Sequence, residues 1–409
     1  MQYNTDIAII GGGAAGLVAA ITAKRLAPAL SVTVAEGLDR VGKKLITTGN
    51  GRCNILNSDL SLSHFHGENK GFCRFAFEKN GYSEIERFFE SIGVDFTKEG
   101  DRVYPASLQA ASVVDALRFE CEKIGVDTLL GCKIKSIKKG EKFTLSSDSD
   151  KISAKAVIVA TGLFSGGEKI GCDGSIFRLL KDMGLSAVKA TPSLVQLKTE
   201  TDFVKQLKGI KVDAKATLFC GGKSLAENTD EVLFCDYGLS GPAILQISRE
   251  SARDDRKYEI SLDLYPERDA EELLSSLSKR AVLLKDRSLE DFFTGSLNKR
   301  LGQVVLKYSG FKLSDPVSSL SKTDIERITN TLKDFRFKVT SNTGFLNSQV
   351  TAGGLSTKEF HEKTMMSKKI KGLFCAGEIL DIDGDCGGFN LAWAWSSGML
   401  AAESAVNYL

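Results

Sequence analysis

The sequence predicts an α/β protein whose first domain, an open sheet covered by helices, is interrupted by a long insertion. Three observations lead to this fold class. The 409 residues exceed what one hydrophobic core usually holds, so two or three domains are expected. The chain opens on an apolar strand, a glycine-rich turn, a helix and a second strand, and related patterns return near its end. Between them the hydrophobic pattern alternates with period two and then repeats at helical spacing.

The opening unit is typical of dinucleotide binding. The apolar strand Asp6–Ile10 runs into GGGAAG, which supplies Gly11, Gly13 and Gly16, and a second strand at Ser31–Ala35 ends on Glu36. The first glycine permits a tight turn, the second lets backbone approach a pyrophosphate, and the third lets the helix pack closely on the strand. Glu36 can accept hydrogen bonds from ribose hydroxyls, and the helix N-terminus favours the pyrophosphate charge. Strand, turn, helix and acid fall at the right offsets, so we predict a Rossmann-type domain rather than an empty glycine turn.

The remaining elements follow from periodicity. A helix is expected at Ser112–Gly125, and strands are expected at Cys132–Lys138, Lys142–Ser146 and Ala156–Ala160, the last running into Thr161-Gly162. The predicted Rossmann-type domain is 1–190 with 341–409, the β-rich part of the insertion is 191–266, and its helical part is 267–340.

Two details support the two parts of the insertion. Tyr258 to Leu264 alternates apolar and polar residues, as a half-buried strand does. In the helical part, Thr323 with Glu326 predicts a capping box, and one apolar stripe is expected from Ile325, Ile328, Leu332 and Phe335.

The C-terminal segment predicts a second anion site. A strand at Gly372–Ala376 is followed by Gly377, Glu378, Asp381 and Asp383, and the turn Gly384–Phe389 leads through Asn390 and Leu391 into a helix. A reduced flavin concentrates negative charge at its N1–C2=O edge, which a helix N-terminus stabilises. Acids in the preceding loop can hold ribityl hydroxyls. We therefore interpret this segment as a flavin-binding turn.

A basic, glycine-rich loop lies at Val41–Asn54. Gly42, Gly49 and Gly51 give a mobile backbone, while Lys43, Lys44 and Arg52 can neutralise phosphate or the flavin edge. Cys53 in the same loop is interpreted as inert packing rather than a redox group.

Composition narrows the function classes. The chain is 26% charged with a net charge of +2, which gives no reason to expect nucleic acid or a membrane surface as partner. Its nine cysteines are scattered and never spaced as C-x-x-C, which argues against a disulfide framework and a zinc site. No apolar run reaches membrane-spanning length. A soluble, cytoplasmic protein without metal is expected, and the sequence leaves its oligomeric state open.

Six segments carry a family resemblance: VGKKLITTGNGRCN, DRVYPASLQAASVVDAL, LVQL, LFCDYGLSGPAILQIS, QVTAGGLSTKE and TMMSKKIKGLFCAGEILDIDGDCGGFNLAWAWSSG. In this order they closely resemble the bacterial Rossmann-fold NAD(P)/FAD-dependent oxidoreductases, the aminoacetone-oxidase family of flavoproteins, which includes the 3-dehydro-bile acid reductase. The resemblance covers essentially the whole chain. It implies non-covalent FAD and a flavin domain interrupted by a β-barrel-like and a helical subdomain. It also implies cofactor contacts near Gly13, Ala15 and the backbone of Ile134.

One segment departs from the family pattern. Where relatives carry Ser-Tyr-Pro and then Gly-Ser-Thr-Gly-Asp-Gly, this chain reads LFSGGEKIGCDGSIF and keeps only Asp173-Gly174. Substrate specificity is therefore not carried over from relatives.

The complete set of predicted cofactor-binding residues combines the motifs with the resemblance. It is Gly11, Gly13, Ala14, Ala15, Gly16, Glu36, Lys43, Lys44, Gly49, Asn50, Gly51, Ile134, Thr161, Gly162, Gly377, Glu378, Asp381, Gly388, Phe389, Asn390 and Leu391.

Only one complete GxGxxG occurs, so no separate NAD(P)H domain is expected and NAD(P)H would dock transiently over the flavin. The leading hypothesis is ping-pong transfer of a hydride from NAD(P)H to the flavin and then to an electron-poor C=C of a small, enone-like substrate. Tyr104 is the expected proton donor, Arg102 the carbonyl polariser, and Arg52 a second polariser. His64, His66 and His361 lie outside the flavin motifs, so histidine is a poor candidate acid.

Two alternatives stay open. The first is a flavin oxidase that acts on an amine or hydroxyl substrate and produces peroxide. The second is a flavin-containing RNA-binding or interaction protein, suggested by the lysine-rich stretch Lys198–Lys215.

Overall fold

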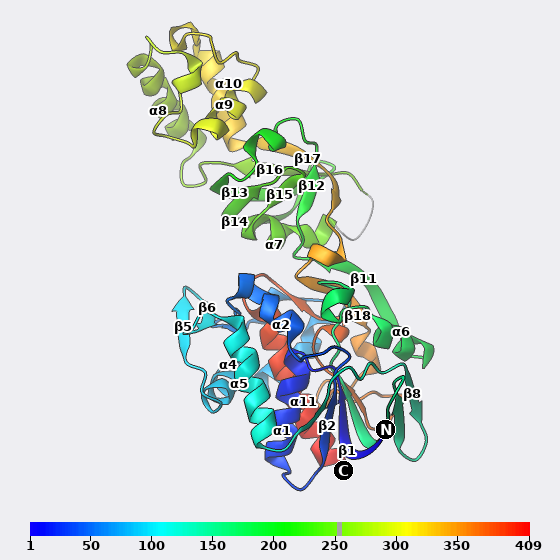
Figure 1. Cartoon of the computed structure of the whole chain (residues 1–409). Coiled ribbons are helices and arrows are strands. Elements are labelled where there is room, and N and C mark those ends of the chain that lie inside the picture. The colour runs from blue at the N-terminus through cyan, green and yellow to red at the C-terminus, as the bar shows by residue number, and fades with distance from the viewer. Residues whose placement is uncertain (252–255) are drawn as a thin grey trace. The chain divides into compact units, whose positions relative to one another are not determined.

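The computed structural model describes residues 1–251 and 256–409 and divides the chain into two compact units (Figure 1). The first comprises Met1–Pro192 with Gln349–Leu409, and the second comprises Ser193–Ser348. The sequence had placed the insertion at 191–340. Residues 252–255 of its β-rich range lie outside the described residues.

A seven-stranded sheet forms the centre of the first unit, in the order β7-β2-β1-β10-β9-β8, with β19 pairing β10. Strands β7, β2, β1, β10 and β19 run parallel, and β8 and β9 form an antiparallel hairpin at one edge. Buried β-branched and alanine side chains on β1 and β10 explain why this is a central, two-sided sheet. The strands are β1 Gln2–Ile10, β2 Val32–Ala35, β7 Asp127–Leu129, β8 Ser136–Lys139, β9 Phe143–Ser146, β10 Lys151–Val159 and β19 Leu373–Cys375.

The expected strand Cys132–Lys138 is only partly present. Its first four residues form no strand, because the backbone N–H of Cys132 donates to the carbonyl of Glu36 (2.8 Å) and turns the chain past the end of β2.

Helices α1 and α11 pack side by side on this sheet, with α5 next to α1 (Figure 1). A Cβ on Gly398 of α11 would lie 2.6 Å from the carbonyl oxygen of Ala15, so only glycine permits this approach. The helices of the unit are α1 Ala14–Leu26, α2 Lys43–Thr47, α3 Arg74–Lys79, α4 Tyr82–Glu90, α5 Ala110–Lys123, α6 Ser175–Asp182 and α11 Phe389–Tyr408.

Three small sheets complete the first unit, and two of them shape the site. They are β3-β6-β5, β20-β4 and β11-β18. Their strands are β3 Leu56–Asn57, β4 Phe65–His66, β5 Phe96–Glu99, β6 Arg102–Pro105, β11 Ala187–Ser193, β18 Val350–Leu355 and β20 Asp383–Gly384.

The second unit contains a closed barrel of six strands, β12-β15-β14-β13-β16-β17. Together with the Rossmann-type sheet and the helices below, the barrel confirms the predicted fold class. The strands are β12 Leu197–Thr199, β13 Lys211–Cys220, β14 Lys223–Phe234, β15 Gly238–Ser240, β16 Tyr258–Asp263 and β17 Phe335–Asn342.

Two parts of the insertion differ from expectation. Helix α7, Pro242–Ser251, lies inside the range expected to be strands; proline is favoured at a first helical position, and Ile244 and Ile247 are buried in the core of this unit. Strand β17 lies in the range expected to be helical. Phe335 therefore does not extend the helical stripe: it packs against Phe337 inside the barrel core, with ring centroids 4.5 Å apart.

The helical part contains α8 Ala270–Leu283, α9 Lys299–Tyr308 and α10 Lys322–Lys333. The predicted capping box of α10 is wrong by two residues. Ser321 and Asp324 form it: Ser321 Oγ accepts the Asp324 N–H (3.2 Å), and Asp324 Oδ2 accepts the Ser321 N–H (3.0 Å). Local spacing admits both registers, and burial of Ile325 and Leu332 selects this one.

Replacing the true cap tests this register. Ser321→Ala should lower the free energy of unfolding by about 1 kcal/mol, because one N–H of the first turn loses its acceptor. The exposed Thr323→Ala is the matched control and should change it by less than about 0.5 kcal/mol. Urea unfolding followed by far-UV circular dichroism measures both. A larger loss for Thr323→Ala would contradict the assignment.

No helix in the described residues is both long and apolar enough to span a membrane.

Candidate functional site

In the glycine turn of the first unit, Gly13 has space for a Cβ, whereas Gly11 and Gly16 do not. A Cβ on Gly16 would lie 1.9 Å from the carbonyl oxygen of Gly11, and one on Gly11 would lie 2.7 Å from that of Ala160. Gly13 differs: the only heavy atom near its hypothetical Cβ is Ala160 O, at 3.9 Å. Gly13 is also the N-cap of α1, and no side chain caps that helix. Gly13, Ala14 and Ala15 thus present a bare helix N-terminus that fits a pyrophosphate.

Glu36 is buried at the end of β2 and organises this turn. Its Oε2 accepts the Gly12 N–H (2.8 Å) and its Oε1 accepts the Leu38 N–H (2.9 Å). Ile134 follows Cys132, whose N–H donates to the Glu36 carbonyl. The structure thus brings Glu36 and Ile134 to one end of β2. Their contacts to a ribose and a base stay predictions.

Lys44 links the basic loop to the C-terminal segment. Its ammonium pairs with Glu378 Oε2, and Glu378 Oε1 accepts the Thr351 N–H (3.0 Å). Burial pulls the pKa of Lys44 down, but the Glu378 carboxylate raises it above its ordinary value, so Lys44 stays charged. Gly162 lies beside the same carboxylate, and Thr161 lies against Gly11. Lys43 instead pairs with the exposed Asp39 (2.6 Å).

Gly377 joins the two predicted nucleotide motifs. A Cβ on it would lie 3.2 Å from the Ala15 Cβ, at a φ of +74°. Its N–H donates to Ser397 Oγ (2.9 Å), and its carbonyl accepts Trp393 Nε1–H (3.2 Å). The opening turn and the C-terminal segment are therefore neighbours in space.

Helix α11 has a second bare N-terminus. Its N-cap Gly388 has φ +99° and provides no side-chain cap. A Cβ there would lie 2.6 Å from the Leu56 carbonyl oxygen, and Asn57 Nδ2 donates to the Gly387 carbonyl (2.8 Å). Asn390 fixes the turn from the other side, since its Oδ1 accepts the Gly384 N–H (2.8 Å). Phe389 and Leu391 belong to this first helical turn.

The three candidate catalytic residues lie near this turn. Gly49, Asn50 and Gly51 all have positive φ, and Gly49 lies against the Tyr104 ring. The Arg52 guanidinium lies 4.4 Å above the same ring and pairs with Glu99, which raises its pKa further. Arg102 shares a strand face with Tyr104, and its Nε lies beside Gly387.

The acids of the loop before α11, which the sequence predicts to hold ribityl hydroxyls, are buried in the protein. Asp381 is 1% exposed, and its Oδ2 accepts the Glu68 N–H (2.8 Å). Asp383 is also buried and pairs with His66 through the β20-β4 ladder. The Asp381 carboxylate therefore helps to hold this loop. Contact of either acid with ribityl hydroxyls stays a prediction.

Sequence reasoning missed the role of two histidines. The structure brings both to Asp385 of the flavin-type turn: His64 Nδ1 lies 2.9 Å from Asp385 Oδ2, and His66 Nε2 lies 2.7 Å from Asp385 Oδ1. Both histidines lie outside the flavin motifs in the sequence, as expected, but they contact the Gly384–Phe389 turn in space. The sequence carried no clear signal for these contacts, because β4 has only two residues and His64 precedes it at the end of the 3-10 turn Leu62–His64.

The cysteine of the basic loop, Cys53, is a buried thiol rather than a reactive one. Cys53 is fully buried, and burial raises its pKa to about 12. This agrees with the interpretation of Cys53 as packing.

The segment LFSGGEKIGCDGSIF, which departs from the family pattern, is held by an ion pair at its retained aspartate. Asp173 pairs with Lys133 (2.5 Å) and accepts the Ser175 N–H (2.8 Å) at the start of α6.

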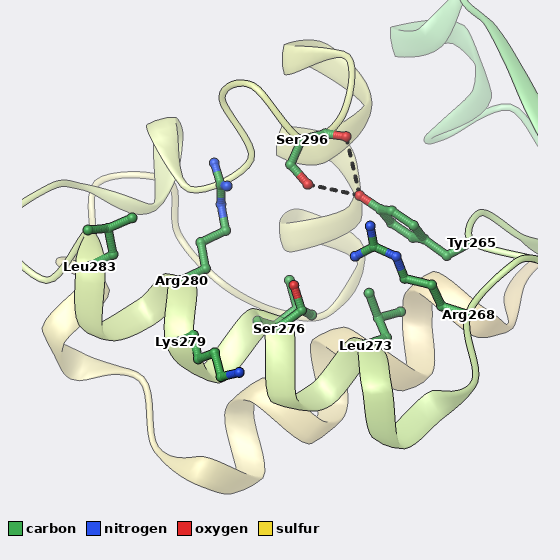
Figure 2. A pocket seen from close by; sticks show the side chains of 9 residues that line it. Tyr265, Arg268, Leu273, Ser276, Lys279, Arg280, Leu283 and Ser296 are labelled. Atoms are coloured by element: carbon green, nitrogen blue, oxygen red, sulfur yellow. Dashed lines mark hydrogen bonds between the residues drawn. The ribbon is translucent and has the colours of Figure 1, made fainter.

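A pocket of about 250 Å³ lies in the helical part of the second unit (Figure 2). Tyr265, Arg268 and residues of α8 line it, and Tyr265 Oη bonds to Ser296. The Arg280 side chain is already held by the carbonyls of Phe292 and Thr294. None of the predicted site residues lines this pocket. Within the described residues, no group of three or more His, Cys, Asp or Glu side chains is arranged to hold a metal.

The first unit thus combines one open dinucleotide turn, a second bare helix N-terminus and a basic glycine-rich loop on a Rossmann-type sheet. This fold and site define the class of protein, an FAD-dependent oxidoreductase. The chain belongs to the HI0933-like Rossmann-domain family, whose model matches residues 5–404.

Relatives match along nearly the full length. The chain is 35% identical over 403 residues to the 3-dehydro-bile acid delta(4,6)-reductase of Clostridium scindens, covering 98% of both chains. It is 29% identical over 411 residues to the ribosomal RNA dihydrouridine synthase of Haemophilus influenzae, again covering 98% of both. Among solved structures, Escherichia coli quinol fumarate reductase shares the fold at 17% identity and a TM-score of 0.53, covering 100% of this chain and 71% of that chain.

Proposed function

We propose that this protein uses FAD and NAD(P)H to reduce a C=C bond conjugated with a carbonyl in a small, enone-like molecule. The observation that carries the proposal is that Arg102 lies beside Gly387 in the turn before α11, on the same strand face as Tyr104, whose ring carries the Arg52 guanidinium. The full-length relation to a reductase of a 3-dehydro-bile acid supports the substrate class.

The residues present fit FAD. Gly13 leaves space where a Cβ would stand, and α1 and α11 each offer an uncapped first turn. In this assignment the α1 turn would hold the pyrophosphate, Glu36 would hold the adenosine ribose, and the α11 turn would stabilise the electron-rich edge of the flavin ring. When bound, FAD supplies reversible hydride storage.

The chain itself supplies binding and proton chemistry. The Tyr104 hydroxyl is the proposed proton donor to the substrate carbon next to the carbonyl. Arg102, beside Gly387, is the proposed hydrogen-bond donor to the carbonyl oxygen. Arg52 lies on the Tyr104 ring and is paired with Glu99, so its first effect is to fix that ring.

One experiment tests the proposal. The purified protein should show a flavin spectrum, and anaerobic NADH or NADPH should bleach it. Subsequent addition of a 3-oxo-Δ4 steroid should restore the oxidised spectrum, while air alone should restore it slowly. A chain that neither carries nor takes up FAD contradicts the proposal. Failure of both nicotinamides to reduce the flavin, with rapid reduction by an amine and peroxide release in air, favours the oxidase instead.

A second substrate class has one specific support. The relation to ribosomal RNA dihydrouridine synthase suggests a uracil base, whose C5=C6 bond is also conjugated with a carbonyl. Replacing the steroid with uridine-containing RNA in the reoxidation step distinguishes the two. If RNA reoxidises the flavin and enones do not, the substrate is RNA rather than a small, enone-like molecule.

Replacing the proposed proton donor gives a sharper readout. Tyr104→Phe should lower the rate of flavin reoxidation by substrate about 100-fold, because general acids commonly contribute 10²–10⁴-fold. The rate of flavin reduction by NAD(P)H should stay within about twofold. Stopped-flow absorbance measures the two half-reactions separately. Equal slowing of both would show that Tyr104 shapes the site rather than donates the proton.

A further inference from the structure

His64 lies between two carboxylates. Its Nδ1 is 2.9 Å from Asp385 Oδ2, and its Nε2 is 3.1 Å from Asp59 Oδ2. A neutral imidazole has one N–H and one lone pair, so one contact would set a lone pair against a carboxylate. Only the imidazolium donates both hydrogen bonds, and the geometry therefore favours a charged His64.

The electrostatics agree with this geometry. Partial burial lowers the pKa of His64, but the hydrogen bonds and charges of Asp385 and Asp59 raise it above its ordinary value. About a third of the side chain is exposed, so protons can exchange with solvent.

His64 is also attached to the turn that begins α11. Its ring stacks on Phe389, with centroids 4.4 Å apart and planes 19° apart. Its backbone carbonyl accepts the Asp385 N–H (2.9 Å). A cation on this imidazole therefore lies against the first residue of the helix whose N-terminus is bare.

Other ionisable groups surround the imidazole. His66 shares Asp385, and Arg102 lies on the side of the turn formed by Gly387. Further groups on the packed elements are Cys386 in the turn, the buried Asp381 and Asp383, and Glu68, which pairs with Lys358. Lys70 and the buried Cys73 lie on the 3-10 helix Lys70–Cys73, which packs against Leu62–His64.

We propose that His64 is a redox-linked ionisable group, which takes up a proton more readily when the cofactor is reduced. This inference rests on the proposed function, in which FAD binds with its ring at the α11 turn. A hydride brings two electrons and one proton to neutral FAD and leaves one net negative charge. That charge stabilises the imidazolium of His64, and the proton that His64 gains comes from solvent. By linkage, protonated His64 raises the midpoint potential of the flavin by the reciprocal amount.

The first measurement is the pKa of His64 in both redox states of the FAD-loaded protein. The chain has three histidines, so imidazole C–H resonances can be assigned with His66→Gln and His361→Gln. The pKa of His64 should be higher after anaerobic reduction by dithionite, while that of the exposed His361 should not move. An unchanged His64 pKa overturns the inference.

The second measurement is the midpoint potential as a function of pH. Between the two pKa values of His64, the wild type should take up one extra proton. For a two-electron couple this adds about 30 mV per pH unit to the slope, because each pH unit is a tenfold change in proton concentration. His64→Gln should lose this segment, and His361→Gln should keep it. A His64→Gln variant with the wild-type slope overturns the inference.

Asp59→Asn separates charge from structure. Asp59 is exposed and lies outside the α11 turn, so its replacement leaves the Asp385 contacts in place. Losing one carboxylate should lower the pKa of His64. The pH range in which the midpoint potential has the extra slope should then move to lower pH. A purely structural clamp would change FAD affinity without moving that pH range, which overturns the inference. If His64→Gln fails to fold, the pH dependence of the midpoint potential of Asp59→Asn provides the test instead. A wild-type protein that binds no FAD contradicts the proposed function itself, whereas normal FAD binding with an unresponsive His64 contradicts only this inference.

Discussion

Gly13→Ala is expected to leave the protein folded and to weaken FAD binding about 100-fold, which corresponds to about 2.7 kcal/mol. The added methyl group meets no protein atom closer than 3.9 Å, and the backbone of Gly13 does not need a positive φ. The methyl group instead occupies the space through which a pyrophosphate approaches the helix N-terminus. Equilibrium titration of the apoprotein with FAD, followed by flavin fluorescence, measures the change.

Two further glycine variants serve as controls for Gly13→Ala. Gly71→Ala lies outside the site, has an ordinary 3.4 Å nearest contact, and should bind FAD like the wild type. Gly16→Ala should fail to fold stably, because its methyl group would lie 1.9 Å from the Gly11 carbonyl oxygen. Undiminished FAD affinity in a folded Gly13→Ala would show that no dinucleotide reaches this turn.

Lys44→Met is expected to lower the free energy of unfolding of the apoprotein by about 2 kcal/mol and to weaken FAD binding as well. The substitution removes the cation that pairs with Glu378, a carboxylate side chain only 17% exposed. Breaking a buried pair costs about 3–5 kcal/mol, and partial exposure of the Lys44 side chain reduces that figure. Urea unfolding of the apoprotein gives the stability, and FAD titration gives the affinity.

The neighbouring lysine is the matched control. Lys43 pairs with Asp39, which is 80% exposed, so Lys43→Met should cost less than about 0.5 kcal/mol. Adding Glu378→Gln to Lys44→Met should restore part of the stability, because it removes the unpaired carboxylate. Equal losses for the two lysine variants would contradict the distinction that the structure draws between them.

The sequence predicted the elements whose signals are local. The requirement for glycine at position 16 is local, because a Cβ there would lie 1.9 Å from the carbonyl oxygen of Gly11, five residues earlier in the same run. An insertion with a β-rich and a helical part was also predictable, since alternation and helical spacing extend over many residues. Its barrel-like form was expected only from the family resemblance.

Prediction failed where several local choices were nearly equal. Ser321 and Thr323 both precede an acid by three residues, and only core packing of α10 selects Ser321. Helix α7 was hidden among strands because its apolar residues also suit a barrel. Strand β17 follows α10 directly, and it was assigned to the helical part because Phe335 stands three residues after Leu332 and continues the helical spacing.

By itself, the sequence determined that this chain has one dinucleotide turn, a second glycine turn before a C-terminal helix, and a domain split by an insertion. Only the tertiary structure decided which charged groups meet. Lys44 rather than Lys43 pairs with Glu378, and His64 meets Asp385 across 321 residues of chain. That contact depends on β4 and β20, strands of two residues each, which are too short to leave a periodic pattern. The glycine spacing of the opening turn is a pattern within one short run of residues, whereas charge pairing is set by how distant segments pack.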